Sequence, residues 1–238
     1  MPVGATGATA TPTSPGAAWL RSIGAAALLL LINFVLGQVF KAIAALAGLP
    51  ASLQVRTAVL LASTMVGELL FFAVLVVWLR RQRCSLDDLG WRRRPPAWAV
   101  VSALLFGVAY GGLTLTNPGL RPFLGILQPL KAEAAVAVLI AAFVEEVAFR
   151  GYVMLELRRA GLPVAVQILA SGAIFGAAHF NYSLPGAVSA FVIGSVFALI
   201  YVFGRRSLIP VIAGHAVVDL IIEPALIMWV LAGFPSPR

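Results

Sequence analysis

The sequence predicts an all-α fold: a polytopic bundle of seven to eight transmembrane helices. Of its 238 residues, 61% are hydrophobic and only 11% are charged, and the mean hydropathy is +0.99. A soluble domain usually carries about 25% charged residues. Apolar runs recur along the chain, each long enough to cross a hydrocarbon layer of ~30 Å. They are continuously apolar rather than alternating, which favours helices over a β-barrel as the spanning structure.

Seven apolar runs predict the individual spans, at about residues 19–47, 57–79, 97–117, 132–157, 163–180, 185–204 and 208–232. Prolines fall at or near the ends of these runs, where they disturb a helix least: Pro50, Pro95, Pro96, Pro118, Pro163, Pro185 and Pro210. The last run contains Glu223-Pro224. It therefore predicts either one kinked helix or a full span followed by a short eighth.

Composition divides the chain into three parts. Residues 1–17 are rich in Ala, Thr, Pro, Gly and Ser and are expected to form a disordered tail. Residues 18–131 are expected to form N-terminal transmembrane helices, and residues 132–234 a separate core that holds the chemistry. No basic region followed by a short apolar stretch and a cleavage site opens the chain, so we expect the first span to act as its own insertion signal.

The net charge of +8 indicates a membrane topology rather than a nucleic-acid partner. Arginines cluster in short loops between the apolar runs, at 80–83, 92–94, 158–159 and 205–206. With Arg21, all of these lie on one side if the loops alternate, which is the positive-inside pattern. We therefore expect a multi-pass protein of the cell membrane with a cytoplasmic N-terminus. Cys84 is the only cysteine, which excludes an internal disulfide and a four-cysteine metal site.

Ionisable residues inside the spans mark the candidate functional site, because burying such groups in lipid is costly. They are Glu68, Glu145, Glu146, Arg150, His179, His215, Asp219 and Glu223. Glu146 and Arg150 stand four residues apart, on one helical face, and are expected to pair. Glu145 points about 100° away and is available for another task. The alternative is that these three residues form one structural ionic lock.

Two further spans place polar side chains at the same depth as Glu145. Phe175-x-x-x-His179 sets an aromatic ring and an imidazole on one face, and His215-x-x-x-Asp219 sets an imidazole beside a carboxylate. Counted at ~1.5 Å per residue from the cytoplasmic ends, all four polar groups lie about 14–24 Å deep. A lone histidine in a helix is often a satisfied interior residue. The agreement in depth favours a single site.

A carboxylate beside imidazoles in a dry pocket can activate water, since the carboxylate takes a proton and the histidines stabilise a developing oxyanion. The same residues could hold a zinc ion, with Glu145, His179 and His215 as ligands and Glu146 or Asp219 completing the set. Both routes lead to hydrolysis of a carbonyl substrate. The chain has no Gly-x-Ser-x-Gly nucleophile motif and no His-Glu-x-x-His zinc motif.

The three motifs together resemble the CPBP family of intramembrane proteases, also called the Abi or CAAX-protease-like family. That family carries Glu-Glu-x-x-x-Arg, then Phe-x-x-x-His, then His-x-x-x-Asn or Asp on three helices, and here the motifs stand in the same order at 145–150, 175–179 and 215–219. The resemblance covers about residues 132–222, and the first three spans carry none of the signature.

The resemblance implies a membrane endopeptidase of glutamate or metal-dependent type. In it Glu145 is the general base for water, His179 assists, His215 and Asp219 form the oxyanion side, and Glu146 and Arg150 support the carboxylate. Because an ionised Asp219 would repel an oxyanion, this residue must be protonated, paired with His215 or bound to metal.

The expected partners are a membrane-associated peptide or protein substrate and the lipid bilayer, without nucleic acid. Two alternatives stay open: a non-enzymatic bacteriocin-immunity or scaffold protein of the same fold, and an ion-coupled transporter. A CAAX substrate in particular does not follow from the sequence.

Overall fold

The computed structural model describes residues 13–126, 130–180 and 184–233, and in these parts every regular element is a helix. The elements are α1 (Pro15–Leu46), α2 (Leu53–Arg81), α3 (Ala97–Leu115), α4 (Arg121–Ile126), α5 (Lys131–Glu146), η2 (Val147–Val153), α6 (Met154–Arg159), α7 (Val164–Ala178), α8 (Leu184–Phe203) and α9 (Leu208–Leu231). The all-α prediction is confirmed. Most of the predicted tail, residues 1–12, lies outside the described residues.

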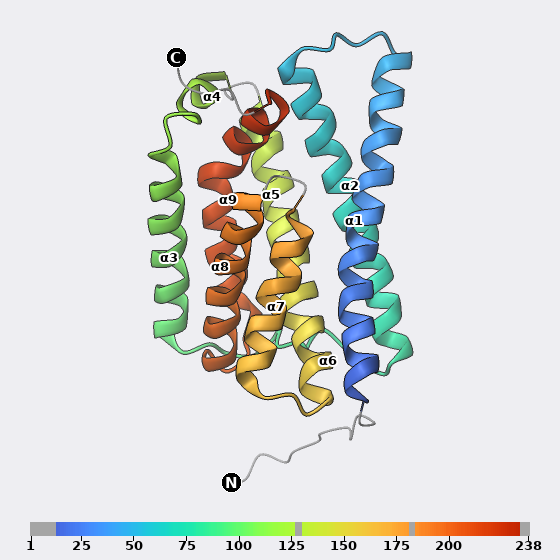
Figure 1. Ribbon diagram of the computed structural model, residues 1–238, viewed down its shortest axis with the longest axis vertical. Coiled ribbons are helices and arrows are strands. Elements are labelled where there is room, and N and C mark those ends of the chain that lie inside the picture. Colours follow the sequence, from blue (N-terminus) through green and yellow to red (C-terminus); the bar gives the residue numbers. More distant parts are fainter. Residues whose placement is uncertain (1–12, 127–129, 181–183, 234–238) are drawn as a thin grey trace.

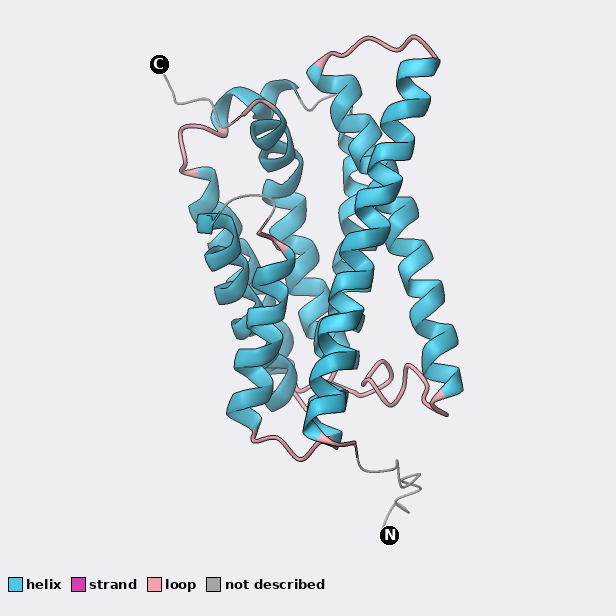
Figure 2. Ribbon diagram, turned by 45° about the vertical axis from the view of Figure 1, so that its right-hand side comes forward, coloured by secondary structure: helices cyan, strands magenta, loops and turns pink. Residues whose placement is uncertain are grey.

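The long helices run up and down beside one another (Figure 1). α1 and α2 form a hairpin on one flank, α3 lies on the opposite flank, and α5, α7, α8 and α9 fill the space between them. α5, η2 and α6 follow one another without a break from Lys131 to Arg159 and so make one rod. Figure 2, coloured by secondary structure, shows that short loops join the rods at the two ends of the bundle.

The helix starts follow from local chemistry. The side chains of Ser14 and Ser52 cap α1 and α2, each accepting a hydrogen bond at 3.3 Å from a first-turn N–H. Such caps satisfy donors that have no partner within the helix. Pro96 and Pro163 directly precede α3 and α7, and Pro210 lies in the first turn of α9. The prediction that these prolines mark the ends of spans is confirmed.

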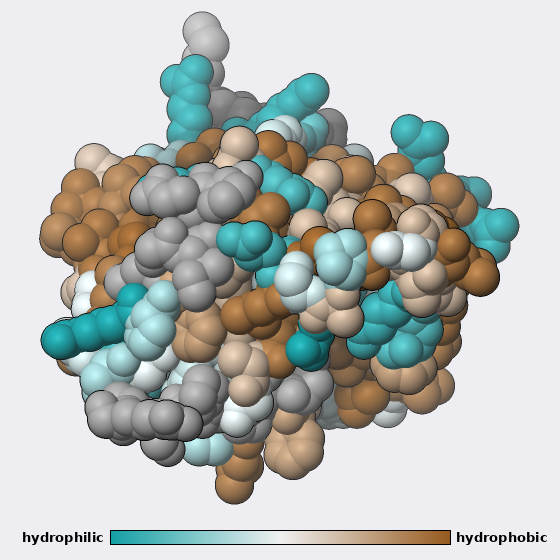
Figure 3. Space-filling model, turned by 90° about the horizontal axis from the view of Figure 1, so that it is seen from above, coloured by the Kyte–Doolittle hydropathy of each residue, from teal (hydrophilic) through white to brown (hydrophobic). Residues whose placement is uncertain are grey.

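The bundle is built for a lipid environment. Four helices, α1, α2, α3 and α8, are long and apolar enough to cross a membrane, and shorter apolar stretches cover Val164–Ala178 and Leu208–Ile222. Large apolar side chains on these helices are exposed, for example Leu31 at 58% and Leu105 at 64%. Seen from above, hydrophilic residues are scattered over the end of the bundle and hydrophobic ones form much of its outline (Figure 3). The chain is a multi-pass membrane protein.

The last apolar run is one helix, α9, which continues to Leu231. This decides the alternative left by Glu223-Pro224 in favour of a single element; the side chains of these two residues lie outside the described part of the structure.

All of the arginine-bearing loops lie at one end of the bundle, the lower end in Figure 1. There the loops bind one another: Ser207 donates a hydrogen bond to the carbonyl of Arg93 at 2.7 Å. The buried Glu156 of α6 pairs with Arg21 of α1 at 2.9 Å, which ties the first helix to the core. The common location of the basic loops agrees with the predicted topology, in which this end faces the cytoplasm.

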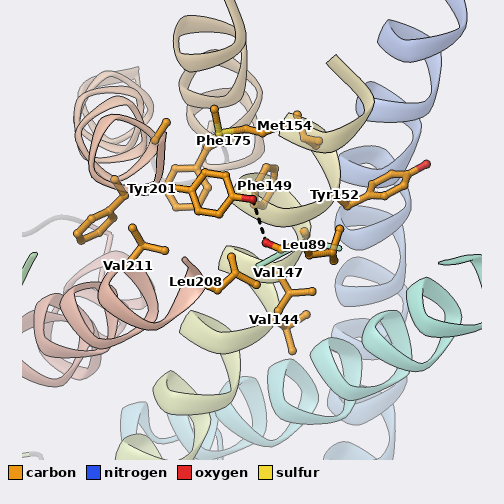
Figure 4. Packing of buried hydrophobic residues seen from close by; sticks show 14 of the residues in the cluster. Leu89, Val144, Val147, Phe149, Tyr152, Met154, Phe175, Tyr201, Leu208 and Val211 are labelled. Carbon is orange, nitrogen blue, oxygen red and sulfur yellow. Dashed lines mark hydrogen bonds between the residues drawn. The ribbon is translucent and has the colours of Figure 1, made fainter. Parts of the chain in front are cut away.

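The loop between α2 and α3 sends one residue into the interior. Leu89 is completely buried, and its carbonyl accepts a hydrogen bond at 2.9 Å from the hydroxyl of Tyr201 on α8. Figure 4 shows Leu89 among Val147, Leu208 and other apolar residues of the core, with this hydrogen bond dashed. The loop therefore closes the lower end of the core rather than covering it loosely.

Glycines let the inner helices approach closely, as small residues do in membrane proteins. On α3, a Cβ atom at Gly107 would lie 2.6 Å from the carbonyl oxygen of Gly214 on α9. On α7, a Cβ at Gly176 would lie 2.8 Å from the carbonyl oxygen of Ala187 on α8. Gly172, one turn before Gly176, also faces α8, so both glycines lie on the contact surface between α7 and α8.

We expect Gly107→Val to lower the melting midpoint of the detergent-solubilised protein, because the new side chain collides with the backbone of α9. Gly112→Val on the same helix is the matched control, since a Cβ there meets nothing within 4 Å. Differential scanning fluorimetry of both variants compares them directly. Equal midpoints would contradict the close α3–α9 contact.

Candidate active site

The two central carboxylates end α5, immediately before a π-helical segment, η2, which covers Val147–Val153. All seven residues of η2 are buried. The sequence predicts one ordinary helix over 132–157, so the wider turn is a difference from that prediction. Single π-turns inside α-helices occur frequently at functional sites, because they shift the side chains that follow them.

Glu146 is fixed by two partners. Its Oε1 accepts a hydrogen bond from Nη1 of Arg150 at 2.8 Å and another from Nδ1 of His215 at 2.8 Å. The side chains of Glu146 and Arg150 are both completely buried. The pairing with Arg150 confirms the interpretation of the i, i+4 spacing. The contact with His215 could not be predicted, because His215 lies 69 residues further along the chain.

Aromatic rings surround the Arg150 guanidinium. Its central carbon lies 4.5 Å from the ring centroid of Phe175 and 5.9 Å from that of Phe197, within cation–π range. A Cβ at Gly194 would come within 3.2 Å of Nη2, so the absence of a side chain there leaves room for the guanidinium. Arg150 is thus held by one carboxylate and two aromatic faces in a site closed to solvent.

His215 lies among three carboxylates. Its Nε2 is 3.8 Å from Oε2 of Glu145 and 3.4 Å from Oδ2 of Asp219, while its Nδ1 faces Glu146. Of the three possible states of Asp219 named above, the structure shows a pairing with His215. Glu145 and Asp219 keep 15% and 14% of their side chains exposed, whereas Glu146 is closed off.

His179 follows the last residue of α7, and its orientation is set by its own helix. Its Nδ1 lies 2.8 Å from the carbonyl oxygen of Phe175. Because a carbonyl only accepts, Nδ1 carries the proton in this contact and Nε2 is the nitrogen with acceptor capacity in the neutral ring. The centroids of Phe175 and His179 are 4.4 Å apart.

Phe175 contacts more of the site than the sequence predicts. Its ring lies against Phe149 at 5.1 Å, His215 at 5.7 Å and the guanidinium of Arg150, besides His179. From the sequence it is only an aromatic residue on the face of His179. The sequence pattern that points to these contacts is the position of Phe175 four residues before His179.

The polar groups border one cavity with a volume of about 540 Å³. Glu145, His179, His215 and Asp219 all line it, so the prediction from their common depth is confirmed for the geometry: three distant helices bring these four residues to one place. The remaining wall is largely apolar and includes residues of α1 and α2, which the sequence did not connect with the site.

A second polar contact borders the same cavity. Nδ2 of Asn33 on α1 donates a hydrogen bond to Oε1 of Glu68 on α2 at 2.9 Å. Glu68 stands out in the sequence as an ionisable residue within a span. Asn33 does not, because an amide carries no charge and its distance from Glu68 along the chain hides the contact.

A zinc site formed by Glu145, His179 and His215 is one of the two alternatives that the sequence leaves open. Among the described residues, no three side chains of His, Cys, Asp or Glu come together in a way that could hold a metal ion. Glu145, His179 and His215 line the same cavity without forming such a set. The zinc ion therefore stays a prediction.

Comparison with known proteins gives one match. Residues 127–221 match the family model described as type II CAAX prenyl endopeptidase Rce1-like, a segment that contains all three motifs. Searches of curated proteins and of solved structures returned no match. Over residues 127–221, the chain is similar to the Rce1-like CAAX proteases, which agrees with the resemblance seen in the sequence.

Proposed function

We propose that the protein is an intramembrane endopeptidase that hydrolyses a membrane-associated peptide or protein. The observation that carries this proposal is that two adjacent carboxylates differ in burial and in their partners. Glu146 is fully buried and held by Arg150 and His215, whereas Glu145 opens onto the cavity beside His215. One carboxylate is thus part of the framework, and the other can reach water and substrate.

In the proposed reaction, Glu145 takes a proton from a water molecule while the water oxygen attacks the peptide carbonyl carbon. His179 assists by accepting a hydrogen bond from this water at Nε2, because its Nδ1 is held by Phe175. The tetrahedral intermediate collapses as the C–N bond breaks, and Glu145 returns the proton to the leaving amine. The products are a new carboxylic acid and a new amine, which together hold all the atoms of the peptide bond and of water, so protons balance without another reagent.

The proposed oxyanion site is His215. When its ring is protonated on both nitrogens, Nδ1 stays bound to Glu146 and Nε2 donates to the oxygen that develops negative charge. Asp219, 3.4 Å from the same nitrogen, positions the ring and balances its charge before substrate enters. Arg150 in turn neutralises Glu146, so that this carboxylate can hold His215 without drawing it away from the cavity. No step in this sequence passes through a metal.

The test uses the purified protein in liposomes with two quenched peptides, one ending in a farnesylated CAAX sequence and one identical but unprenylated. Cleavage in H₂¹⁸O should place one ¹⁸O atom in the new carboxylate, as mass spectrometry would show. Cleavage that survives Glu145→Gln would contradict the assignment of the base. A protein that binds either peptide equally well before and after that substitution, and cleaves neither, would favour the immunity or scaffold alternative.

We expect Phe175→Leu to lower kcat by about tenfold with a smaller change in KM, because the ring that orients both histidines is lost and a displacement of even 1 Å slows catalysis. Phe180→Leu is the matched control, since that ring is 63% exposed. Steady-state kinetics on the cleaved peptide separate kcat from KM. An equal effect of the two substitutions would show that Phe175 does not position the site.

The proposal also includes a substrate associated with the membrane and an N-terminus on the cytoplasmic side. The cavity lies between helices whose outer faces are apolar, so a substrate in the bilayer can approach from the side. The arginine-rich end is assigned to the cytoplasm by the positive-inside rule.

A further inference from the structure

We propose that Asn33 and Glu68 form a second substrate-binding site of the cavity, in which Oε2 of Glu68 accepts a hydrogen bond from a main-chain N–H of the bound peptide. That the ligand is a peptide rests on the proposed function. The site lies on α1 and α2, outside the segment of residues 127–221 that matches the family model. It would make these two helices part of substrate recognition.

The first observation is an unsatisfied buried carboxyl oxygen. Glu68 is only 2% exposed, and one of its oxygens, Oε1, is bound to Asn33. Its other oxygen, Oε2, is buried and has no hydrogen-bond partner among the described residues. Leaving such a group without a partner costs free energy, more so for a charged group, and native structures rarely do so without a functional reason.

The second observation is the position of this group. Glu68 borders the same cavity as Glu145, His215 and Asp219, on the wall contributed by the α1–α2 hairpin. A ligand that fills this cavity can therefore contact both Glu68 and Glu145. An ionisable side chain that lies within a span and lines such a cavity is a candidate functional residue. A carboxylate whose only role is to connect two helices could lie between them without lining a cavity.

The third observation is that Asn33 is held in place. A Cβ atom at Gly67 would collide with the side-chain oxygen of Asn33, so the amide packs directly against this glycine. The amide nitrogen then points to Glu68 and occupies Oε1. Asn33 thus fixes the carboxyl group in one orientation, and Oε2 is the atom that stays available.

The chemistry of the available atoms indicates the ligand group. Two oxygens of the pair, Oε2 of Glu68 and Oδ1 of Asn33, lack hydrogen-bond donors in the described residues. The complement of an oxygen acceptor is an N–H donor, and an extended peptide presents one at every residue, alternating from side to side. Nearby wall residues such as Leu61 and Phe34 suit apolar side chains. A peptide chain supplies both features.

The binding test uses the catalytically silenced Glu145→Gln protein and a fluorescein-labelled peptide ending in a farnesylated CAAX sequence. Adding Glu68→Leu should raise the Kd about tenfold, as expected for one lost hydrogen bond. Ser63→Ala is the matched control and should leave the Kd unchanged, because Ser63 is a polar residue of α2 whose hydroxyl donates to the carbonyl of Leu60 and which is not among the residues that line the cavity. Fluorescence anisotropy in nanodiscs gives both values.

A double-mutant cycle separates this role from a structural one. Methylating the peptide nitrogens one at a time should reveal one position at which N-methylation weakens binding about tenfold to the Glu145→Gln protein. The same methyl group should have little effect once Glu68 is Leu. Additive effects at every position would overturn the proposal, as would a Glu68→Leu substitution that lowers the melting midpoint and leaves the Kd unchanged.

A second variant and two further outcomes complete the binding test. If Glu68→Leu does not fold, Glu68→Gln replaces it: the amide oxygen stays bound to Nδ2 of Asn33, and the amide nitrogen, which only donates, takes the place of Oε2. The effect of N-methylation should then disappear, and additive effects there also overturn the proposal. Failure of the peptide to bind the Glu145→Gln protein overturns it as well. A non-additive cycle with a wild-type protein that cleaves neither peptide would refute the proposed hydrolysis while supporting this site.

Discussion

Replacing Glu145 by glutamine is expected to lower kcat/KM by a factor of about 10²–10⁴, which is the usual contribution of a positioned general base. Glutamine has nearly the same shape, so the cavity and the contact with His215 are disturbed little, but an amide cannot take a proton from water. Because Glu145 is partly exposed and pairs with His215 only at 3.8 Å, its charge supports the fold less than that of Glu146 does. The melting midpoint should therefore change little.

The matched control is Glu133→Gln, which removes a carboxylate from the first turn of the same helix, α5. Its kcat/KM should equal that of the wild type. Initial rates on the quenched peptide, measured for all three proteins in the same liposomes, decide the outcome. If both substitutions reduced the rate equally, loss of helix or membrane stability would explain the effect, and Glu145 would lose its role as base.

Replacing Arg150 by methionine is expected to lower the free energy of unfolding by about 3–5 kcal/mol, the usual result of removing one partner from a buried ion pair. Glu146 would keep its charge in a site with no exposure to water, with only His215 as a partner. The aromatic rings that now face the guanidinium would also lose their cation–π contacts. Denaturation in mixed detergent micelles would measure the loss.

A double variant, Glu146→Gln with Arg150→Met, should recover much of this stability. The glutamine is neutral, and its oxygen can still accept from Nδ1 of His215. Arg56→Met is the control for loss of an arginine as such, because Arg56 lies exposed in the first turn of α2. A double variant as unstable as Arg150→Met alone would show that the guanidinium, rather than its pairing with Glu146, maintains the core.

Much of the fold could be predicted from simple patterns. The apolar runs correspond to α1, α2, α3, the α5–α6 rod, α7, α8 and α9. Four of these helices, α1, α2, α3 and α8, have the length and composition that crossing a lipid layer requires. Prolines mark the helix starts for a similarly local reason. The π-helical turn at Val147–Val153 could not be predicted, because its residues do not differ in kind from those of an ordinary buried helix.

For the site, local spacing predicted the pairs within one helix, and common depth predicted that Glu145, His179, His215 and Asp219 line one cavity. Hydrogen bonds between different helices could not be predicted from spacing or depth. The hydrogen bond from His215 to Glu146 and the one from Asn33 to Glu68 depend on how the rods rotate against one another. Periodicity within a single helix carries no information on that rotation.

The wall that α1 and α2 contribute to the cavity has a consequence for how this protein diverges from its relatives. The proposed reacting groups come from the segment that matches the family model, whereas Asn33, Glu68 and their apolar neighbours come from the hairpin before it. Substitutions in the hairpin can therefore alter which substrates are admitted without disturbing the groups that break the bond. If the proposed site on the hairpin binds substrate, a chimera that joins this hairpin to the core of another protein matched by that family model should keep this protein's selectivity.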